Sequence, residues 1–99
     1  MALNVRIKPR AAQQIEKAAA WWADNRPAAP GGIRNDLRAT LEALVEQPGI
    51  GTKVENSRNQ EIRRVNLTRI RYFMYYRVKG SYLEVVAFWH ENRGSTPHV

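Results

Sequence analysis

The side chains best suited to chemistry in this sequence are arginines, and they are concentrated in one stretch. Residues 58–79 hold seven basic side chains and one acidic side chain, Glu61, so the segment carries a net charge of +6. The basic residues are Arg58, Arg63, Arg64, Arg69, Arg71, Arg77 and Lys79. A guanidinium group binds phosphate or carboxylate through two parallel hydrogen bonds, so the stretch predicts contact with an anionic macromolecule. A solvated face that only confers solubility is the alternative.

Acid–base and metal-binding side chains are scarce. The chain has two histidines, His90 and His98, and no cysteine. Since no cluster of His, Asp and Glu has metal-ligand spacing, we expect no metal site and no cofactor. His90 ends a predicted strand, where it could act as a general base or could simply hydrogen-bond to the backbone. His98 lies next to the C-terminus, where chains are usually frayed.

Length and composition limit the class of protein. The 99 residues carry a formal charge of +7, and 43% of them are hydrophobic, including three tryptophans. This composition excludes intrinsic disorder, and the length predicts a single domain over residues 1–99 with no second catalytic domain. No apolar stretch is long enough for a signal peptide or a membrane span. We therefore expect a cytoplasmic protein with no membrane contact.

Two helices are predicted to follow a short first strand. Alternation of apolar and polar residues at 3–8 predicts a half-buried strand, and Pro9 suits the first turn of the helix that follows. Apolar stripes at helical spacing predict a helix over 10–25 and a second helix that ends at Pro48, with Pro and Gly breakers between them. The stripes consist of Ala12, Ile15, Ala19 and Trp22, and then of Ile33, Leu37, Leu41, Leu44 and Val45.

The second half of the chain changes to a period of two. Residues 50–60 show no period and are predicted to form a loop, and strands follow at 62–67, 71–78 and 82–90. The last strand is predicted to place four residues on one face: Leu83, Val85, Ala87 and Trp89. The element order is β-α-α-β-β-β, which predicts an α+β fold with a helical hairpin packed on a small antiparallel sheet.

Four segments carry short motifs whose order and spacing matter together. They are Leu-x-x-x-Pro-Gly at 44–49, Ile-Arg-Arg-Val at 62–65, the Arg- and Tyr-rich run at 68–78, and the segment 85–94. In a basic chain of this length and element order, these motifs resemble the RelE/ParE superfamily of bacterial type II toxins. The resemblance covers almost the whole chain. It implies a toxin that is held inactive by a small cognate antitoxin.

The superfamily has two mechanistic branches. RelE-like toxins cleave mRNA on the ribosome, whereas ParE-like toxins inhibit DNA gyrase and have no known hydrolytic centre. If Tyr76 and Val78 anchor the RelE-like pattern Arg-x-x-Tyr-x-Val, its arginine position falls on Phe73, which cannot stabilise a phosphate or move a proton. The tyrosine expected a few residues after Arg93 is also missing. The ParE-like branch is therefore favoured, with gyrase or the gyrase–DNA complex as target and a cognate antitoxin as partner.

The expected target-binding residues lie on the C-terminal strands. They are Arg63, Arg64, Arg69, Arg71, His90 and Arg93. The alternative is an mRNA endoribonuclease acting with the ribosome, in which Arg71, His90, Arg93 or His98 would replace the usual catalytic groups. A third possibility is a domain that keeps the fold but has lost toxicity. Trp21 lies beside the apolar stripe of the first helix, either as an anchor for a partner or at the edge of the core.

Overall fold

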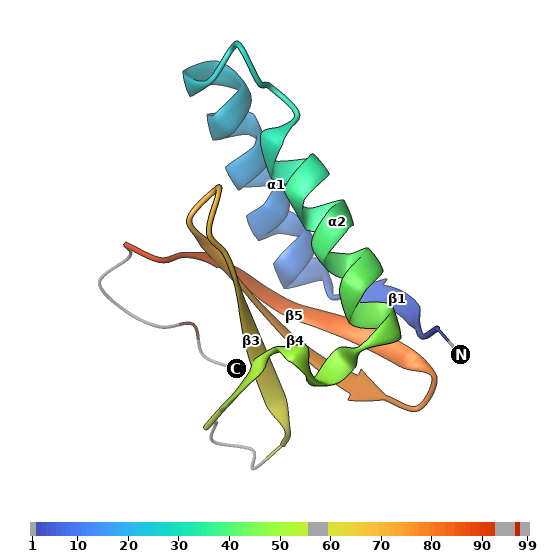
Figure 1. Cartoon of the computed structure of the whole chain (residues 1–99). Coiled ribbons are helices and arrows are strands. Elements are labelled where there is room, and N and C mark those ends of the chain that lie inside the picture. The colour runs from blue at the N-terminus through green and yellow to red at the C-terminus, as the bar shows by residue number, and fades with distance from the viewer. Residues whose placement is uncertain (1, 56–59, 93–96, 98–99) are drawn as a thin grey trace.

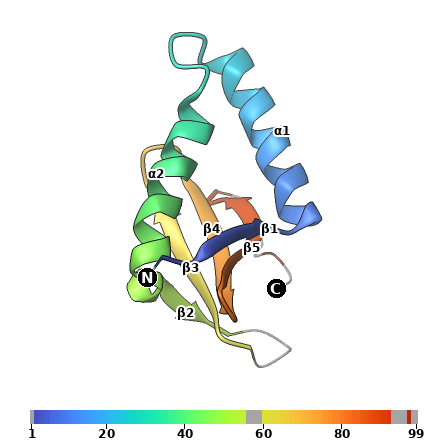
Figure 2. The same ribbon diagram turned by 90° about the vertical axis from the view of Figure 1, so that its right-hand side faces the viewer.

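A helical hairpin lies along one face of a five-stranded sheet, and its tip extends past the end of that sheet (Figures 1 and 2). The computed structural model describes residues 2–55, 60–92 and 97. The elements are β1 (Asn4–Ile7), α1 (Pro9–Asn25), α2 (Gly32–Glu46), the 3₁₀ turn η1 (Pro48–Ile50), β2 (Thr52–Val54), β3 (Ile62–Leu67), β4 (Tyr72–Lys79) and β5 (Tyr82–His90). The predicted α+β class and the helical hairpin are confirmed. Neither described helix is long and apolar enough to cross a membrane.

The sheet differs from the predicted antiparallel one at both edges. The strand order is β1-β5-β4-β3-β2. Strands β3, β4 and β5 form the predicted meander, but β1 runs parallel to β5, with Val5 opposite Leu83, so the sheet is mixed. At the other edge, β2 pairs with β3, although β2 lies inside the segment 50–60 that is predicted to be a loop. A strand of three residues is too short to show a period of two, which explains why the prediction missed it.

Strand β1 is more exposed than its alternating pattern predicts. All four of its residues are exposed, including Val5 at 42% and Ile7 at 38%. The prediction of a half-buried first strand is therefore wrong for these residues. The reason is the position of β1 at the edge of the sheet, where only β5 lies beside it.

A β-bulge in β5 changes which side chains share a face. Tyr75 lies opposite Ala87, but the next residue, Tyr76, lies opposite Val85, so Val86 is the extra residue. Leu83 and Val85 pack in the core beneath the helices, whereas Ala87 and Trp89 belong to an apolar cluster on the outer face of the sheet. The prediction of a single face for these four residues is wrong, because an inserted residue reverses the alternation beyond it.

The main core lies between the hairpin and the sheet. The central residues of the predicted helix stripes are buried there, and on α1 the buried alanines are Ala11 and Ala18, one position before those predicted. The largest fully buried side chains are Tyr76, Phe88, Ile33, Leu44, Met74, Leu83 and Val85. This core fixes α1 against β5.

Trp22 fixes the tip of the hairpin. Its indole Nε1–H donates to the carbonyl oxygen of Ala29 at 2.8 Å. A Cβ at Gly32 would lie 2.5 Å from that Nε1, so only glycine lets the indole pack against the start of α2. The adjacent residue, Trp21, is 52% exposed and lies on a different side of α1.

Tyr76 fastens η1 and β2 to the core. Its hydroxyl donates to the carbonyl of Pro48 at 2.7 Å and accepts from the N–H of Gly51 at 2.9 Å. Burial raises the pKa of the Tyr76 phenol above its usual 10.0, although the hydrogen bond from Gly51 and the charge of Arg63 act in the opposite direction. The phenol is therefore protonated, and able to donate, throughout the neutral range.

Candidate functional site

The structure does not gather the predicted arginines on one surface. Arg63 donates to the carbonyl oxygens of Gly51 at 2.6 Å and Gly49 at 3.3 Å, and its side chain is only 23% exposed. Its neighbour Arg64 lies on the opposite face of β3, as adjacent strand residues must, with its guanidinium carbon 4.3 Å from the ring centroid of Phe73. Arg63 therefore holds the η1–β2 segment in place, while Arg64 covers an aromatic ring.

Arg77 is also an internal partner. Its Nε donates to Glu84 at 2.6 Å, and a second nitrogen donates to Gln60 at 2.6 Å. The side chains of Arg77 and Glu84 are 14% and 6% exposed, and Arg6 adds a contact of 3.9 Å to Glu84. Burial by itself would raise the pKa of Glu84, but the hydrogen bond and charge of Arg77, with the charges of Lys8 and Arg6, hold that pKa below its usual value. Much of the charge of residues 58–79 is thus used inside the fold.

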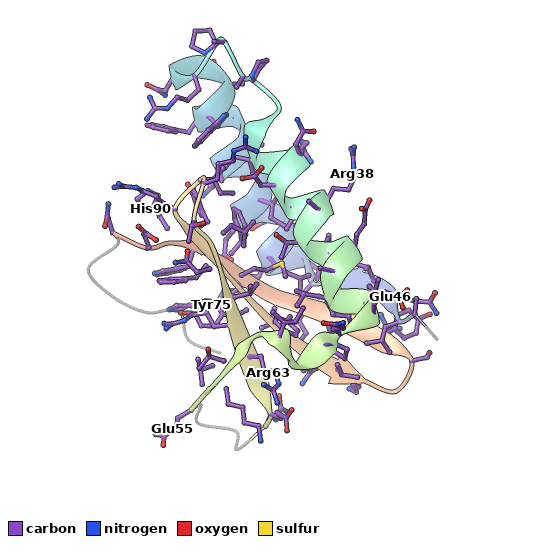
Figure 3. The ribbon with its side chains drawn as sticks, in the orientation of Figure 1. Arg38, Glu46, Glu55, Arg63, Tyr75 and His90 are labelled. Atoms are coloured by element: carbon purple, nitrogen blue, oxygen red, sulfur yellow. The ribbon has the colours of Figure 1, made fainter. Side chains whose placement is uncertain are left out.

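Arg69, Arg71 and His90 do come together, at the end of the sheet nearest the hairpin tip. Arg69 and Arg71 lie in the turn between β3 and β4, and the carbonyl of Arg71 accepts from the N–H of Glu91, which ties this turn to the end of β5. Figure 3 shows His90 far from Arg63, which lies toward the other end of the sheet. Arg93 and His98 lie outside the described residues.

These residues line a cavity of about 420 Å³ between α1 and the β3–β4 turn. Its walls are Trp21, Trp22, Arg26, Arg69, Ile70, Arg71, Tyr72 and His90. A second cavity of about 750 Å³ shares Trp21, Tyr72 and His90 with the first and extends along α1. Its other walls are Arg10, Gln13, Gln14, Lys17, Ala18, Phe88, Trp89 and Asn92. We call the two cavities together the basic cleft.

His90 sits where the two cavities meet. Its Nδ1 accepts the N–H of Asn92 at 3.1 Å, and its ring meets Tyr72 edge-on at 5.0 Å. Tyr72 in turn stacks on Phe88 at 4.6 Å between ring centroids. The hydrogen bond to the backbone predicted for this histidine is confirmed. Because Nδ1 accepts, we assign the proton of the neutral ring to Nε2, which can donate to a ligand.

The charge of the basic cleft is entirely positive. Within residues 2–55, 60–92 and 97, every charged side chain that lines either cavity is Lys or Arg. Of these, Arg69 also reaches Asp36 at 3.5 Å, although its own side chain is 82% exposed. No group of three or more His, Cys, Asp or Glu that could hold a metal occurs among the described residues. Such a lining attracts an anionic partner and supplies no carboxylate to pair with His90 for acid–base work.

Sequence reasoning missed the contribution of α1 to this site. Arg10, Lys17 and Trp21 recur at helical spacing on one face of α1, and Arg26 follows directly after the helix. The net charge did not indicate these cations, because basic and acidic residues cancel when they are summed over residues 9–48. The spacing of polar residues opposite the apolar stripe is the signal that could have revealed this face.

Phe73 is the residue on which the arginine of the RelE-like pattern falls if Tyr76 and Val78 are its anchors. It pairs with Trp89 across β4 and β5 and belongs to the outer apolar cluster with Ile62, Tyr75 and Ala87. The guanidinium of Arg64 lies over its ring. In that register the position of the pattern's arginine holds a packed aromatic ring, and the cation nearby is that of Arg64 on β3.

Comparison with known proteins gives a family and a fold. A profile of the family described as "ParE toxin of type II toxin-antitoxin system, parDE" matches residues 5–94. The chromosomal ParDE toxin–antitoxin system from P. aeruginosa contains a similar chain, with a TM-score of 0.72, 14% identity, and 90% of this chain and 96% of that chain covered. A double mutant of E. coli toxin RelE in the free state is similar at a TM-score of 0.66 and 17% identity, covering 93% and 86%. No curated protein sequence matches the chain.

Proposed function

This chain belongs to the ParE toxin family of type II toxin–antitoxin systems, and we propose that it inhibits DNA gyrase and is neutralised by a cognate antitoxin. The observation that supports this action most directly is the basic cleft. Every charged side chain that lines the cleft in the described part of the chain is a cation, and no carboxylate lines it together with His90. An open, positive surface of this kind is suited to docking on a large anionic complex such as gyrase with its DNA.

Neutralisation by an antitoxin is proposed on the same electrostatic grounds. The toxin carries a net charge of +7, and a protein with this charge associates fastest with an acidic partner. We expect the antitoxin to be acidic. A neighbouring gene encoding a small acidic protein would agree with this expectation.

The gyrase proposal is tested with purified toxin in a DNA supercoiling assay. The test variant is the double charge reversal Arg69→Glu with Arg71→Glu in the cleft. The matched control is Arg34→Glu with Arg38→Glu on α2, which adds the same negative charge away from the cleft. The ion pair between Arg34 and Glu16, at 2.8 Å, is exposed and contributes little to stability.

We expect wild type and control to inhibit supercoiling, and the cleft variant to lose inhibition while remaining folded by circular dichroism. Undiminished inhibition by a folded cleft variant would overturn the role of the cleft. Failure of the wild type to inhibit gyrase at all would overturn the proposed target.

Ribosome-dependent mRNA cleavage remains the second candidate function. The observation in its favour is that Arg71 and His90, two of the groups proposed as substitutes for the usual catalytic residues, line one cavity. A ribosomal mRNA-cleavage assay run beside the supercoiling assay separates the two functions. Site-specific cuts within codons, together with normal supercoiling, would establish cleavage and reject gyrase inhibition.

A further inference from the structure

The two cavities of the basic cleft are neighbours along α1, and we treat them together as one groove. The side chains of Trp21, Tyr72 and His90 line both cavities. Cations are placed along the whole groove, beginning with Arg10 and Lys17 on α1, which are about 10 Å apart along the helix axis. Arg26 and Arg71 lie at the other end. The groove therefore offers repeated positive charges along a line, which matches a chain of phosphates better than a single anion.

An exposed aromatic ring lies in the middle of this line of charge. Trp21 lines both cavities and is 52% exposed, and the guanidinium of Arg26 lies 5.8 Å from its ring centroid. The neighbouring Trp22 already has a structural task, because its indole N–H bonds to Ala29 and its ring packs on Gly32. Trp21, by contrast, leaves half of its surface exposed beside several cations of the cleft. The combination is the one that single-stranded nucleic acids require, in which bases stack on aromatic rings while phosphates meet Lys and Arg.

We propose that the basic cleft binds a short single-stranded nucleic acid segment, with one base stacked on Trp21 and the adjoining phosphates on Lys17, Arg26 and Arg71. A duplex is disfavoured because its bases are already stacked on one another and present no free face to the indole. The inference deepens the proposed function and rests on it, since a gyrase–DNA complex would supply such a strand. Its direct test uses only the toxin and an oligonucleotide.

The charges and the ring make separable contributions to binding. Three phosphates neutralised on a single strand give a slope of about −2 in a plot of log K against log salt concentration. Removing two of the three cations reduces that slope to about −0.7. Removing the stacking ring weakens binding by roughly five- to 150-fold and leaves the slope unchanged. A residue that only supported the fold would not change the affinity and the salt slope separately.

The test is fluorescence anisotropy of labelled oligothymidylate and oligouridylate of about 12 nucleotides, titrated with the full chain over a range of salt concentrations. The variants are Trp21→Ala, the conservative Trp21→Phe, and the pair Arg26→Gln with Arg71→Asn. Arg71 has a φ of 62°, and asparagine is among the non-glycine residues that best tolerate this left-handed conformation, so the substitution removes charge at little backbone cost. The control is Arg34→Gln with Arg38→Gln, which removes the same charge from α2.

We expect Trp21→Ala to weaken binding at an unchanged salt slope, and Trp21→Phe to retain most of the wild-type affinity. The double arginine variant should lower the slope. The control should bind as wild type does. Single-stranded DNA and RNA both offer a base that can stack and phosphates that can pair with cations. The oligonucleotide that binds more tightly identifies the natural ligand, DNA for a gyrase complex and RNA for a message.

Three results would overturn the inference: no binding of either oligonucleotide, equal losses in the control and cleft variants, or displacement of bound strand by polyglutamate as readily as by unlabelled oligonucleotide. The first would mean that the cleft takes no single strand, the second that only nonspecific charge attracts the strand, and the third that the cleft takes an acidic peptide. If gyrase is inhibited without oligonucleotide binding, this inference fails and the proposed function stands. If the oligonucleotide binds and gyrase is not inhibited, the proposed target fails and strand binding by the cleft stands.

Discussion

Replacing Glu84 by glutamine tests whether the charge of residues 58–79 is used inside the fold. Glu84 is buried on β5 and bonds to Arg77 at 2.6 Å. The change Glu84→Gln keeps the shape of the side chain and one acceptor oxygen but leaves the Arg77 guanidinium, itself only 14% exposed, without a counter-charge. Breaking a buried pair from one side typically costs 3–5 kcal/mol, about half of a small domain's stability.

We expect the lower end of that range, about 3 kcal/mol, because Gln60 and the new amide oxygen still accept from Arg77. For a domain of this size such a loss lowers the melting temperature by roughly 15 °C. The assay is urea unfolding followed by tryptophan fluorescence. The matched control is Glu16→Gln, which breaks an exposed ion pair to Arg34 at 2.8 Å and should change the unfolding free energy by no more than about 0.5 kcal/mol.

The pH dependence gives this prediction a second measurement. The pKa of Glu84 is lowered in the folded state, so the unfolded chain binds the extra proton first as pH falls. The stabilisation is complete above the ordinary pKa of 4.5 and is lost as pH falls through the lowered folded value. The gap in unfolding free energy between wild type and Glu84→Gln should therefore be largest near neutral pH and should narrow below about pH 4.

Two outcomes would refute the reasoning. One is a loss at Glu84→Gln no greater than that of the Glu16→Gln control. The other is a large loss in the double variant Glu84→Leu with Arg77→Met, because replacing both members of a buried pair by apolar side chains of similar volume is usually close to neutral.

The remaining predictions concern the two contacts that hold the loops to the core. Tyr76→Phe removes the hydroxyl of a buried residue, which makes one buried and one partly buried hydrogen bond, and should lower the unfolding free energy by about 2 kcal/mol in urea titrations, whereas Tyr82→Phe should change it little. A loss at Tyr76→Phe no larger than at Tyr82→Phe would contradict this account. Gly32→Ala places a methyl group 2.5 Å from the indole nitrogen of Trp22 and should destabilise by about 1–3 kcal/mol despite the better helix propensity of alanine. Gly49→Ala has open space around its new methyl and is the control; equal thermal shifts in both glycine variants would show that Trp22 moves aside at no cost.

The helices and the meander could be predicted because their signals are local. A stripe such as Ile15 on α1 or Leu37 on α2 repeats within a few residues, and a helix or strand imposes that repeat wherever it lies in the fold. Glycine and proline between the helices mark the hairpin for the same reason. These features, with the motif order, were enough to predict the family that the comparison confirms.

The bulge at Val86 and the edge strands depended on pairing with distant segments. Nothing in the residues of β5 distinguishes an inserted residue from a regular one, because the bulge exists only relative to the register of β4. Strand β1 looks half-buried by its pattern and is exposed because it pairs at the edge of the sheet.

The sequence by itself determined that this protein is a small basic α+β domain with its positive charge concentrated in residues 58–79. Only the tertiary structure decided which of those charges face a ligand. It turned Arg63 and Arg77 inward to carbonyl and carboxylate oxygens, and it set Arg71 beside Arg26, a residue 45 positions earlier in the sequence. Composition counts charges along the chain, whereas a binding site depends on distances through space, and those are fixed by how α1 packs against the end of the sheet.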